Sequence, residues 1–215
     1  LHLRLPRINI SMRRFPAHYP KEFAVFKTLT SGRKVQDFLD TIPMNFEKKG
    51  DTCRSPLFAL RHNEAHCMEG AKLAAAAFWF QGKQPLLLDL ETTLDDESHV
   101  VALFRERGGW GAVSKTNHAV LRYRDPVYKN PRELALSYFH EYFLDNGKKT
   151  LRSYAVFNLE KIKRNWITDE KDLWYIDRAL DRTRHIPLVN AGDVKMLRRA
   201  DFIERRAGKL TAWHR

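Results

Sequence analysis

The sequence predicts an α+β fold in which helices precede and follow a small antiparallel sheet along the chain. Three observations lead to this prediction. A helical segment covers roughly residues 64–80, four short strand-like segments follow it, and the pattern becomes helical again after residue 157. The connections between the strand-like segments are too short for crossovers, so an antiparallel meander is the expected topology.

The expected elements of the first half each have a signal at their ends. Apolar residues at helical spacing predict a helix over residues 33–42, which Pro43 ends. Residues 45–56 are expected to form a loop. Alanines favour the following helix over residues 64–80, which Gly82 ends. The strands are expected at residues 85–91, 99–105, 110–115 and 118–124.

The second half of the chain is expected to contain one helix, then one strand, and after that only helices. Asn130 and Pro131 open a helix as N-cap and first residue, and Gly147 ends it. Residues 148–157 are expected as one further strand. Helices are then expected from Thr168 and over residues 194–206.

These elements suggest a core with two basic flanks. Residues 1–50 form a basic N-terminal segment with one helix, residues 51–157 the core, and residues 158–215 a basic helical C-terminal extension packed on the core. The chain begins without a methionine, which makes Met12 a candidate native start and residues 1–11 an upstream addition.

The composition excludes several classes of protein. Of the 215 residues, 43% are hydrophobic and 30% charged, which suits one domain with its own core. No apolar run long enough to span a membrane and no signal peptide is apparent. Two cysteines, Cys53 and Cys67, cannot form a disulfide scaffold and suit a reducing cytoplasm, which is the expected location.

The positive charge is concentrated at the two ends of the chain. The net charge is +12, from 38 Lys and Arg against 26 Asp and Glu. Residues 1–50 and residues 151–215 each carry +6, whereas residues 51–150 are balanced. Clustered cations favour phosphate-bearing partners, so nucleic acid is a candidate partner, although no nucleic-acid-binding motif is present and solvated basic flanks are the simpler interpretation.

Cys67 and His99 are the two residues whose placement suggests chemistry. Cys67 lies early in the expected helix of residues 64–80, where free backbone N–H groups and the helix dipole favour a thiolate. His99 begins the expected second strand, where an imidazole can accept the thiol proton and return it to a leaving group. We therefore expect Cys67 as nucleophile and His99 as general base, with the N–H of Cys67 helping to hold an oxyanion.

Four segments around these residues resemble the transglutaminase-like superfamily. They are His66-Cys67-Met68-Glu69-Gly70-Ala71, Leu86-Leu87-Leu88-Asp89-Leu90, Ser98-His99-Val100-Val101-Ala102-Leu103 and Gly109-Trp110-Gly111-Ala112-Val113. The resemblance covers residues 51–124. It implies a papain-like core, in which a helix bearing the nucleophilic Cys packs on a small antiparallel sheet, with a His on the second strand and an Asp on the third. It implies thiol chemistry on an amide or acyl group, whether crosslinking, hydrolysis or amide formation.

The third position of the implied triad carries no acid in this chain. The acid of the family usually lies four residues after a strand Trp, and counting from Trp110 gives Ser114. Hairpin geometry leads to the same residue. A turn centred on residues 107–108 places His99 opposite Thr116 and makes Ser114 its diagonal neighbour on the same face.

Two further residues remain open as the third member. An odd-length turn would favour Lys115 or Asn117, and a Cys-His-Asn set is a known variant. Asp125 has the right chemistry, but it ends the expected fourth strand at the far edge of the sheet. Ser114 and Asn117 therefore rank above Asp125, and a neutral residue would orient the imidazole without stabilising its cation.

Other polar residues near the pair are expected to play no chemical part. His62 and His66 are spaced like two metal ligands, but no third ligand is clear, so no metal and no cofactor are expected. Glu69 is expected to be a solvated helix residue, with recognition of a substrate amine as the functional alternative. Cys53 is expected to be packed rather than paired with Cys67.

Two functions follow from these observations. The first is a cysteine-dependent enzyme that transfers an acyl group or hydrolyses an amide, acting on a peptide, a protein or a small acyl or amide substrate. The second is a non-catalytic binding module on the same scaffold, whose basic flanks bind nucleic acid or an acidic protein. Thiol reactivity that depends on His99 separates the first from the second.

Overall fold

One open, six-stranded antiparallel sheet forms the centre of the protein. The computed structural model describes residues 14–214, so the prediction about residues 1–11 and Met12 lies outside the described residues. The strand order is β4-β3-β2-β1-β5-β6. The bounds are β1 Leu86–Thr92, β2 His99–Glu106, β3 Gly109–Val113, β4 Arg124–Tyr128, β5 Leu151–Asn158 and β6 Ile186–Pro187. The α+β class and the antiparallel meander of the first four strands are confirmed.

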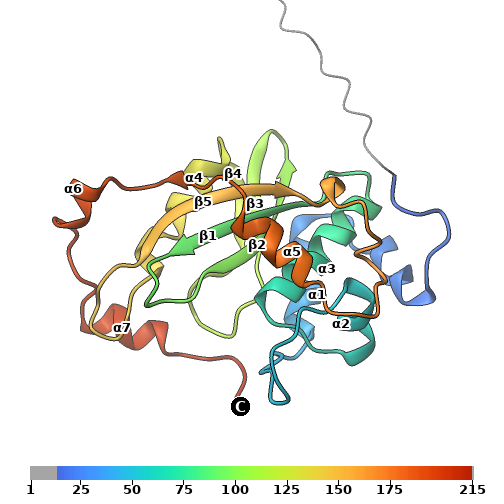
Figure 1. Cartoon of the computed structure of the whole chain (residues 1–215), viewed down its shortest axis with the longest axis horizontal. Coiled ribbons are helices and arrows are strands. Elements are labelled where there is room, and N and C mark those ends of the chain that lie inside the picture. The colour runs from blue at the N-terminus through green and yellow to red at the C-terminus, as the bar shows by residue number, and fades with distance from the viewer. Residues whose placement is uncertain (1–13, 215) are drawn as a thin grey trace, which may run out of the picture.

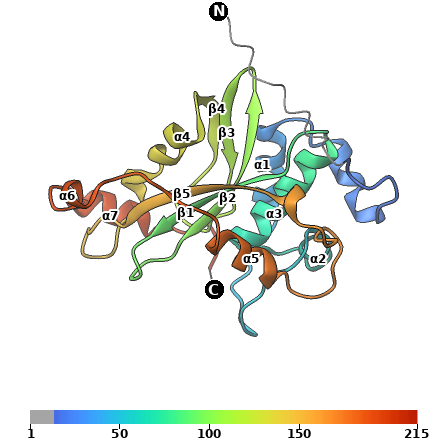
Figure 2. The same cartoon turned by 45° about the horizontal axis from the view of Figure 1, so that its top comes forward.

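Helices cover both faces of this sheet (Figure 1, Figure 2). The α-helices are α1 Gly32–Thr41, α2 Pro56–His62, α3 Cys67–Phe80, α4 Pro131–Ser137, α5 Trp174–Asp181, α6 Ala191–Val194 and α7 Phe202–Gly208. Short 3₁₀ helices are η1 Lys21–Lys27, η2 Phe139–Glu141 and η3 Leu159–Lys161. Helices α1, α2, α3 and α5 pack on one face and α4 on the other. No helix within residues 14–214 is long and apolar enough to cross a membrane.

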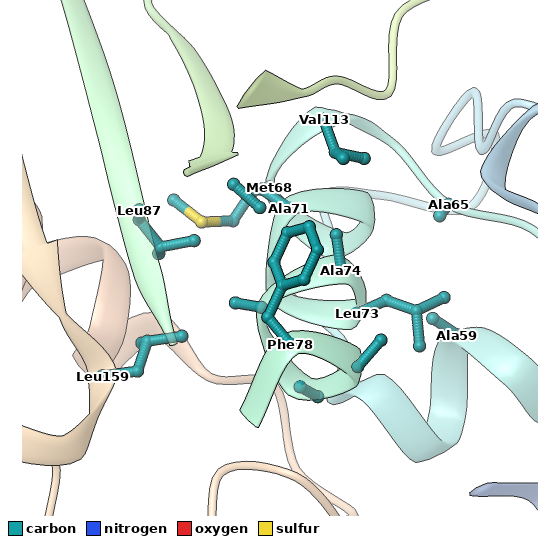
Figure 3. Close-up of a cluster of buried hydrophobic side chains, with 14 of the residues drawn as sticks. Ala59, Ala65, Met68, Ala71, Leu73, Ala74, Phe78, Leu87, Val113 and Leu159 are labelled. Carbon is teal, nitrogen blue, oxygen red and sulfur yellow. The ribbon is translucent and has the colours of Figure 1, made fainter. Parts of the chain in front are cut away.

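Helix α3 is the central packing element on the first face. From Met68 to Phe78 every residue of the helix is buried. Alternation along β2 places Val100, Ala102 and Phe104 in the cluster around α3, whereas the intervening residues pack on the α4 side. Figure 3 shows the small alanines of α3 facing neighbouring elements, which lets the helix approach them closely. This packing fixes the start of α3, where Cys67 lies.

The helical region before the sheet differs from the sequence prediction. Residues 45–56 were expected to form a loop, but α2 begins at Pro56 with the Ser55 hydroxyl accepting from the N–H of Phe58 at 3.4 Å. Asn63 ends α2 with a left-handed φ of 51°. The predicted helix of residues 64–80 therefore starts three residues late, at Cys67, which makes this cysteine the first helical residue.

The fourth strand was placed too early by the prediction. Residues 118–123 lie outside the strands, and β4 begins at Arg124, so that Asp125 lies within the strand and is exposed. The reason lies at Leu121, whose φ of 60° no strand residue adopts. The N–H of Leu121 donates to Glu141 Oε2 at 2.6 Å, which holds this conformation.

The C-terminal region contains more and shorter secondary-structure elements than predicted. The single helix expected over residues 194–206 is replaced by the separate helices α6 and α7, because Asp201 accepts from the N–H groups of Ile203 and Glu204 and starts α7. The helix expected from Thr168 begins at Trp174. The extension that was predicted to be helical also supplies β6, which pairs with β5.

Candidate active site

Cys67 occupies the first position of α3 and is partly exposed. The backbone N–H of Cys67 is one of the first four N–H groups of the helix, which have no hydrogen-bond acceptor within the helix. These groups lie at the positive end of the helix dipole. Glu69, two residues further on, accepts from the N–H of His66 at 3.2 Å and so fixes the start of the helix. The sulfur is thereby presented at a helix N-terminus with free donors around it.

Two imidazoles flank this sulfur. His66, the N-cap residue of α3, has its Nδ1 4.0 Å from Cys67 Sγ, and His99 interacts with the thiol from the start of β2. Burial by itself would raise the pKa of the Cys67 thiol, but hydrogen bonds and charge from His66 and His99 outweigh burial and lower that pKa to about 5. The sulfur is therefore a thiolate at neutral pH.

His66 carries a positive charge beside the thiolate. Its Nε2 lies 3.0 Å from the carbonyl oxygen of Thr52, which can only accept, so Nε2 bears a proton. The carboxylates of Glu69 and Glu47 lie 3.6 Å and 3.8 Å from the same nitrogen. Burial disfavours the imidazolium, but Cys67 and these two carboxylates outweigh burial and raise the pKa of His66 to about 9.

His99 is oriented by Ser114. The β2–β3 pairing places Ala102 opposite Val113, which is the register expected for a turn at residues 107–108. His99 Nε2 lies 2.9 Å from Ser114 Oγ, and the Ser114 hydroxyl donates to the carbonyl oxygen of Leu121. Since the single hydroxyl proton is used there, Ser114 accepts from Nε2–H of His99. The other ring nitrogen, Nδ1, remains for the sulfur.

The carbonyl oxygen of Leu121, which accepts the hydrogen bond from Ser114, is itself held in place. Leu121 adopts its left-handed conformation with its N–H on Glu141, and Glu141 also forms an ion pair with Arg124 on β4. A left-handed leucine costs roughly 1 kcal/mol or more, so the surrounding structure imposes it. A chain of hydrogen bonds thus runs from Glu141 through Leu121 and Ser114 to His99.

The other predicted candidates lie elsewhere in the structure. Asn117 exchanges two hydrogen bonds with the backbone of Trp213 and has no hydrogen bond to His99 within the described part of the chain. Lys115 donates to the carbonyls of Leu39 and Ile42 at the end of α1, and burial lowers its pKa to about 8. Asp125 is exposed on the edge strand β4, which β3 separates from His99.

Cys53 and Glu69 are two further residues about which the sequence led to an expectation. Cys53 is buried and unpaired, as expected, and accepts from the ammonium of the fully buried Lys72 at 3.0 Å. The expectation of a solvated Glu69 is wrong, because its side chain is fully buried. It accepts from Asn45 Nδ2, Thr52 Oγ1 and the N–H of Arg54. These bonds tie residues 45–54 to the first turn of α3.

The sulfur lies where two cavities meet. The first, of about 430 Å³, includes Cys67, His99, Asn117, Tyr142 and residues of α7 in its lining. The second, of about 440 Å³, lies on the other side and is lined by these residues: His66, Cys67, Met68, Asp89, Glu91, Ser98, Val100, Asp177, Leu180, Asp181 and His185. Cys67 and Ser98 are the residues that the linings of the two cavities share.

His66 is the functional residue that the sequence reasoning did not assign. It was considered only as a metal ligand with His62, whereas the structure directs His66 to Cys67 and has His62 bonded to the carbonyl of Phe58. The available signal was its position next to Cys67 at a helix start. Within the described residues no group of three or more His, Cys, Asp or Glu side chains has the arrangement of a metal site.

No protein-family model matches the chain, and no curated protein matches it.

Proposed function

We propose that the protein is a cysteine-dependent enzyme that transfers an acyl group or hydrolyses an amide, with a transglutaminase-like, papain-like core. One observation carries the proposal: the Cys67 sulfur lies at the start of α3 between two imidazoles, His66, which is charged, and His99, which Ser114 orients so that its Nδ1 can hold the thiol proton. A thiolate at neutral pH beside a correctly oriented imidazole is the arrangement that nucleophilic catalysis requires.

The reaction would proceed by two acyl transfers. The Cys67 thiolate attacks the carbonyl carbon of the substrate, and the N–H groups at the start of α3 stabilise the oxyanion. Nδ1 of His99, which takes the proton of the Cys67 thiol when the thiolate forms, donates this proton to the leaving group, which departs and leaves a thioester on Cys67. Water or an amine then gives its proton to His99 and attacks the thioester, which releases the product and restores the thiolate.

The two cavities support a reaction with two substrates. An acyl donor in one cavity places its carbonyl against the sulfur that both cavities share. The acceptor, water or an amine, can then approach from the other cavity without displacing the acyl group. This division favours acyl transfer and hydrolysis over simple binding as the use of the site.

An activated ester tests the proposal directly. We expect p-nitrophenyl acetate to give a rapid burst of p-nitrophenolate and to leave one acetyl group on Cys67, detected by mass spectrometry of the digested protein. Cys67→Ser should abolish the burst and His99→Asn should slow it strongly, whereas Cys53→Ser should leave it unchanged. If Cys67 acetylates no faster than a free cysteine, the enzyme proposal is wrong and the binding-module alternative is favoured.

A further inference from the structure

A separate cavity of about 230 Å³ is lined almost entirely by cations. Its lining consists of Lys148, Lys149, Arg152, Val194, Lys195, Leu197 and Arg199. No carboxylate is among the described residues that line it, and it shares no lining residue with either cavity at Cys67. Any ligand that enters it therefore meets five positive charges and two apolar side chains.

Most of these charges have no counter-charge in the protein. Lys148 pairs with Asp95 at 2.8 Å. Within residues 14–214, Lys149, Arg152, Lys195 and Arg199 form no ion pair. Like charges that share a small cavity repel one another, and this repulsion is relieved when an anion binds among them.

Lys149 is the most covered of these cations. The residue is only 7% exposed, while its ammonium keeps contact with solvent and has no hydrogen-bond partner among the described residues. An ammonium at the wall of a small cavity, where part of its hydration is lost, is stabilised by an opposite charge. An anion in the cavity supplies the missing partner.

The cavity is also held in shape before any ligand arrives. The Arg152 guanidinium donates to the carbonyls of Leu151 and Lys149, at 2.9 Å in each case. Arg199 donates to the carbonyl of Asn146 at 3.3 Å. Figure 1 shows the segment between α6 and α7 passing beside the start of β5, which brings the two groups of cations together. Side chains fixed in this way lose little entropy on binding.

We propose that this cavity binds the phosphate or diphosphate group of a small phosphorylated molecule. Guanidinium and ammonium groups together match the charge and the acceptor oxygens of phosphate. The enclosed volume suits one or two phosphate groups with part of the attached molecule, and Val194 and Leu197 provide an apolar contact for that part. The site is independent of the chemistry proposed for Cys67.

Titration with inorganic diphosphate at constant ionic strength tests this proposal. We expect saturable binding of one diphosphate by isothermal titration calorimetry and a rise in the midpoint of thermal unfolding. The double variant Lys195→Ala/Arg199→Ala removes two exposed cations and should weaken binding by about tenfold or more. The matched control Arg33→Ala/Lys34→Ala removes two exposed cations from α1 and should bind as tightly as the unchanged protein.

Further variants and ligands test the same proposal. Lys149→Met should abolish binding, and circular dichroism shows whether this variant is folded; Cys67→Ser should bind normally, which separates this site from the proposed enzyme. Equal weakening in the two double variants would mean a diffuse charge effect and overturn the proposal, as would chloride at the same ionic strength reproducing the stabilisation. Tight binding of single-stranded RNA that survives Lys195→Ala/Arg199→Ala, without diphosphate binding, would assign the basic charge to nucleic acid instead.

Discussion

His99 Nε2 lies 2.9 Å from Ser114 Oγ, and the direction of this hydrogen bond is fixed because Ser114 gives its own proton to the carbonyl of Leu121. Ser114 thus selects the tautomer of His99 whose Nδ1 can take a proton from Cys67. A hydroxyl cannot stabilise an imidazolium as an aspartate does. A further positive charge beside the thiolate is supplied by His66, which Glu69 and Glu47 help to keep protonated.

The first prediction concerns Ser114→Ala. Without the hydroxyl, His99 loses the acceptor for Nε2–H, and its ring is free to rotate or to take the other tautomer. We expect acetylation of Cys67 by p-nitrophenyl acetate to slow by about tenfold to a hundredfold, measured by stopped-flow absorbance. The matched control is Thr116→Ala, whose hydroxyl contacts the N–H of His118 and not His99. Equal slowing in both variants would contradict an orienting role for Ser114.

The second prediction concerns the pH dependence of Cys67 alkylation. The thiol pKa is lowered to about 5, so the rate with iodoacetamide should rise as the pH increases through about 5 and then stay level through neutral pH. A free cysteine, with a pKa of about 8.5, would still be rising there. His66→Asn should move the rise to higher pH, because one of the two stabilising imidazoles is lost. A profile that rises only above neutral pH would contradict the ion pair.

The third prediction concerns the stability provided by Glu69. Burial alone would raise its pKa, but the charge of His66 and hydrogen bonds from Asn45, Arg54 and Thr52 outweigh burial and lower it. A carboxylate with a lowered folded pKa stabilises the protein above its unfolded pKa, and this stability is lost as the pH falls through the folded pKa. Glu69→Gln should therefore lower the free energy of unfolding at neutral pH by roughly 3 kcal/mol in urea titrations.

Unfolding measurements at acidic pH provide the control for Glu69→Gln. Below its folded pKa the native carboxyl is already neutral, so the difference between Glu69→Gln and the unchanged protein should shrink on acidification. Glu64→Gln serves as a matched variant, because Glu64 is partly exposed and, within residues 14–214, forms an ion pair only with Arg54. A loss of stability in Glu64→Gln as large as that in Glu69→Gln would contradict the importance of the buried position.

The contact between His99 and Ser114 was predictable because it depends on a short hairpin. The turn at residues 107–108 fixes the register of β2 and β3, and alternation then decides which side chains meet. The same local reasoning identified α3, β1 and β5. Their apolar patterns and end residues lie within a few positions of one another, so the observed ends differ from the expected ones by three residues at most.

The parts that were not predictable depend on distant contacts. The irregular path through Leu121 is imposed by Glu141, 20 residues away, and it displaced the expected fourth strand. Glu69 looked like a surface residue because its partners lie in a segment 15 to 24 residues earlier. The role of Asn117 is set by Trp213, 96 residues away. No local pattern contains this information.

The fourth prediction concerns Asn117 and the C-terminal segment that it holds. Its amide donates to the carbonyl of Trp213 at 3.0 Å and accepts from the N–H of Trp213 at 2.7 Å, and Gly208 and Lys209 of the same segment line the cavity at Cys67. Asn117→Ala should release this segment and lower the free energy of unfolding by only about 1 to 2 kcal/mol.

The reactivity of the thiol distinguishes this role from a part in catalysis. We expect Asn117→Ala to react with iodoacetamide at an unchanged rate, because the thiolate is untouched. A bulky maleimide should react several times faster because the cavity is more open. A strong fall in the iodoacetamide rate would instead return Asn117 to the third position of a Cys-His-Asn set.

The last prediction concerns Tyr142, a residue that lines the same cavity as Cys67. The side chain is only 3% exposed, and its hydroxyl has no hydrogen-bond partner among the described residues. Burial raises the pKa of Tyr142 well above its ordinary value, so the hydroxyl keeps its proton at neutral pH and can donate. A buried donor without a partner is unfavourable, and it is retained in a folded protein when a ligand satisfies it.

Tyr142→Phe should therefore separate stability from turnover. The free energy of unfolding should stay unchanged or rise by about 1 kcal/mol, because no protein hydrogen bond is lost. Acetylation of Cys67 should slow by about a hundredfold if the hydroxyl stabilises the oxyanion, with the iodoacetamide rate unchanged because alkylation forms no oxyanion. Tyr138→Phe is the control, since its hydroxyl is already bonded to the carbonyl of Arg122 and its loss should cost stability without slowing acetylation. A Tyr142→Phe protein that acetylates normally would show that this phenol takes no part in the reaction.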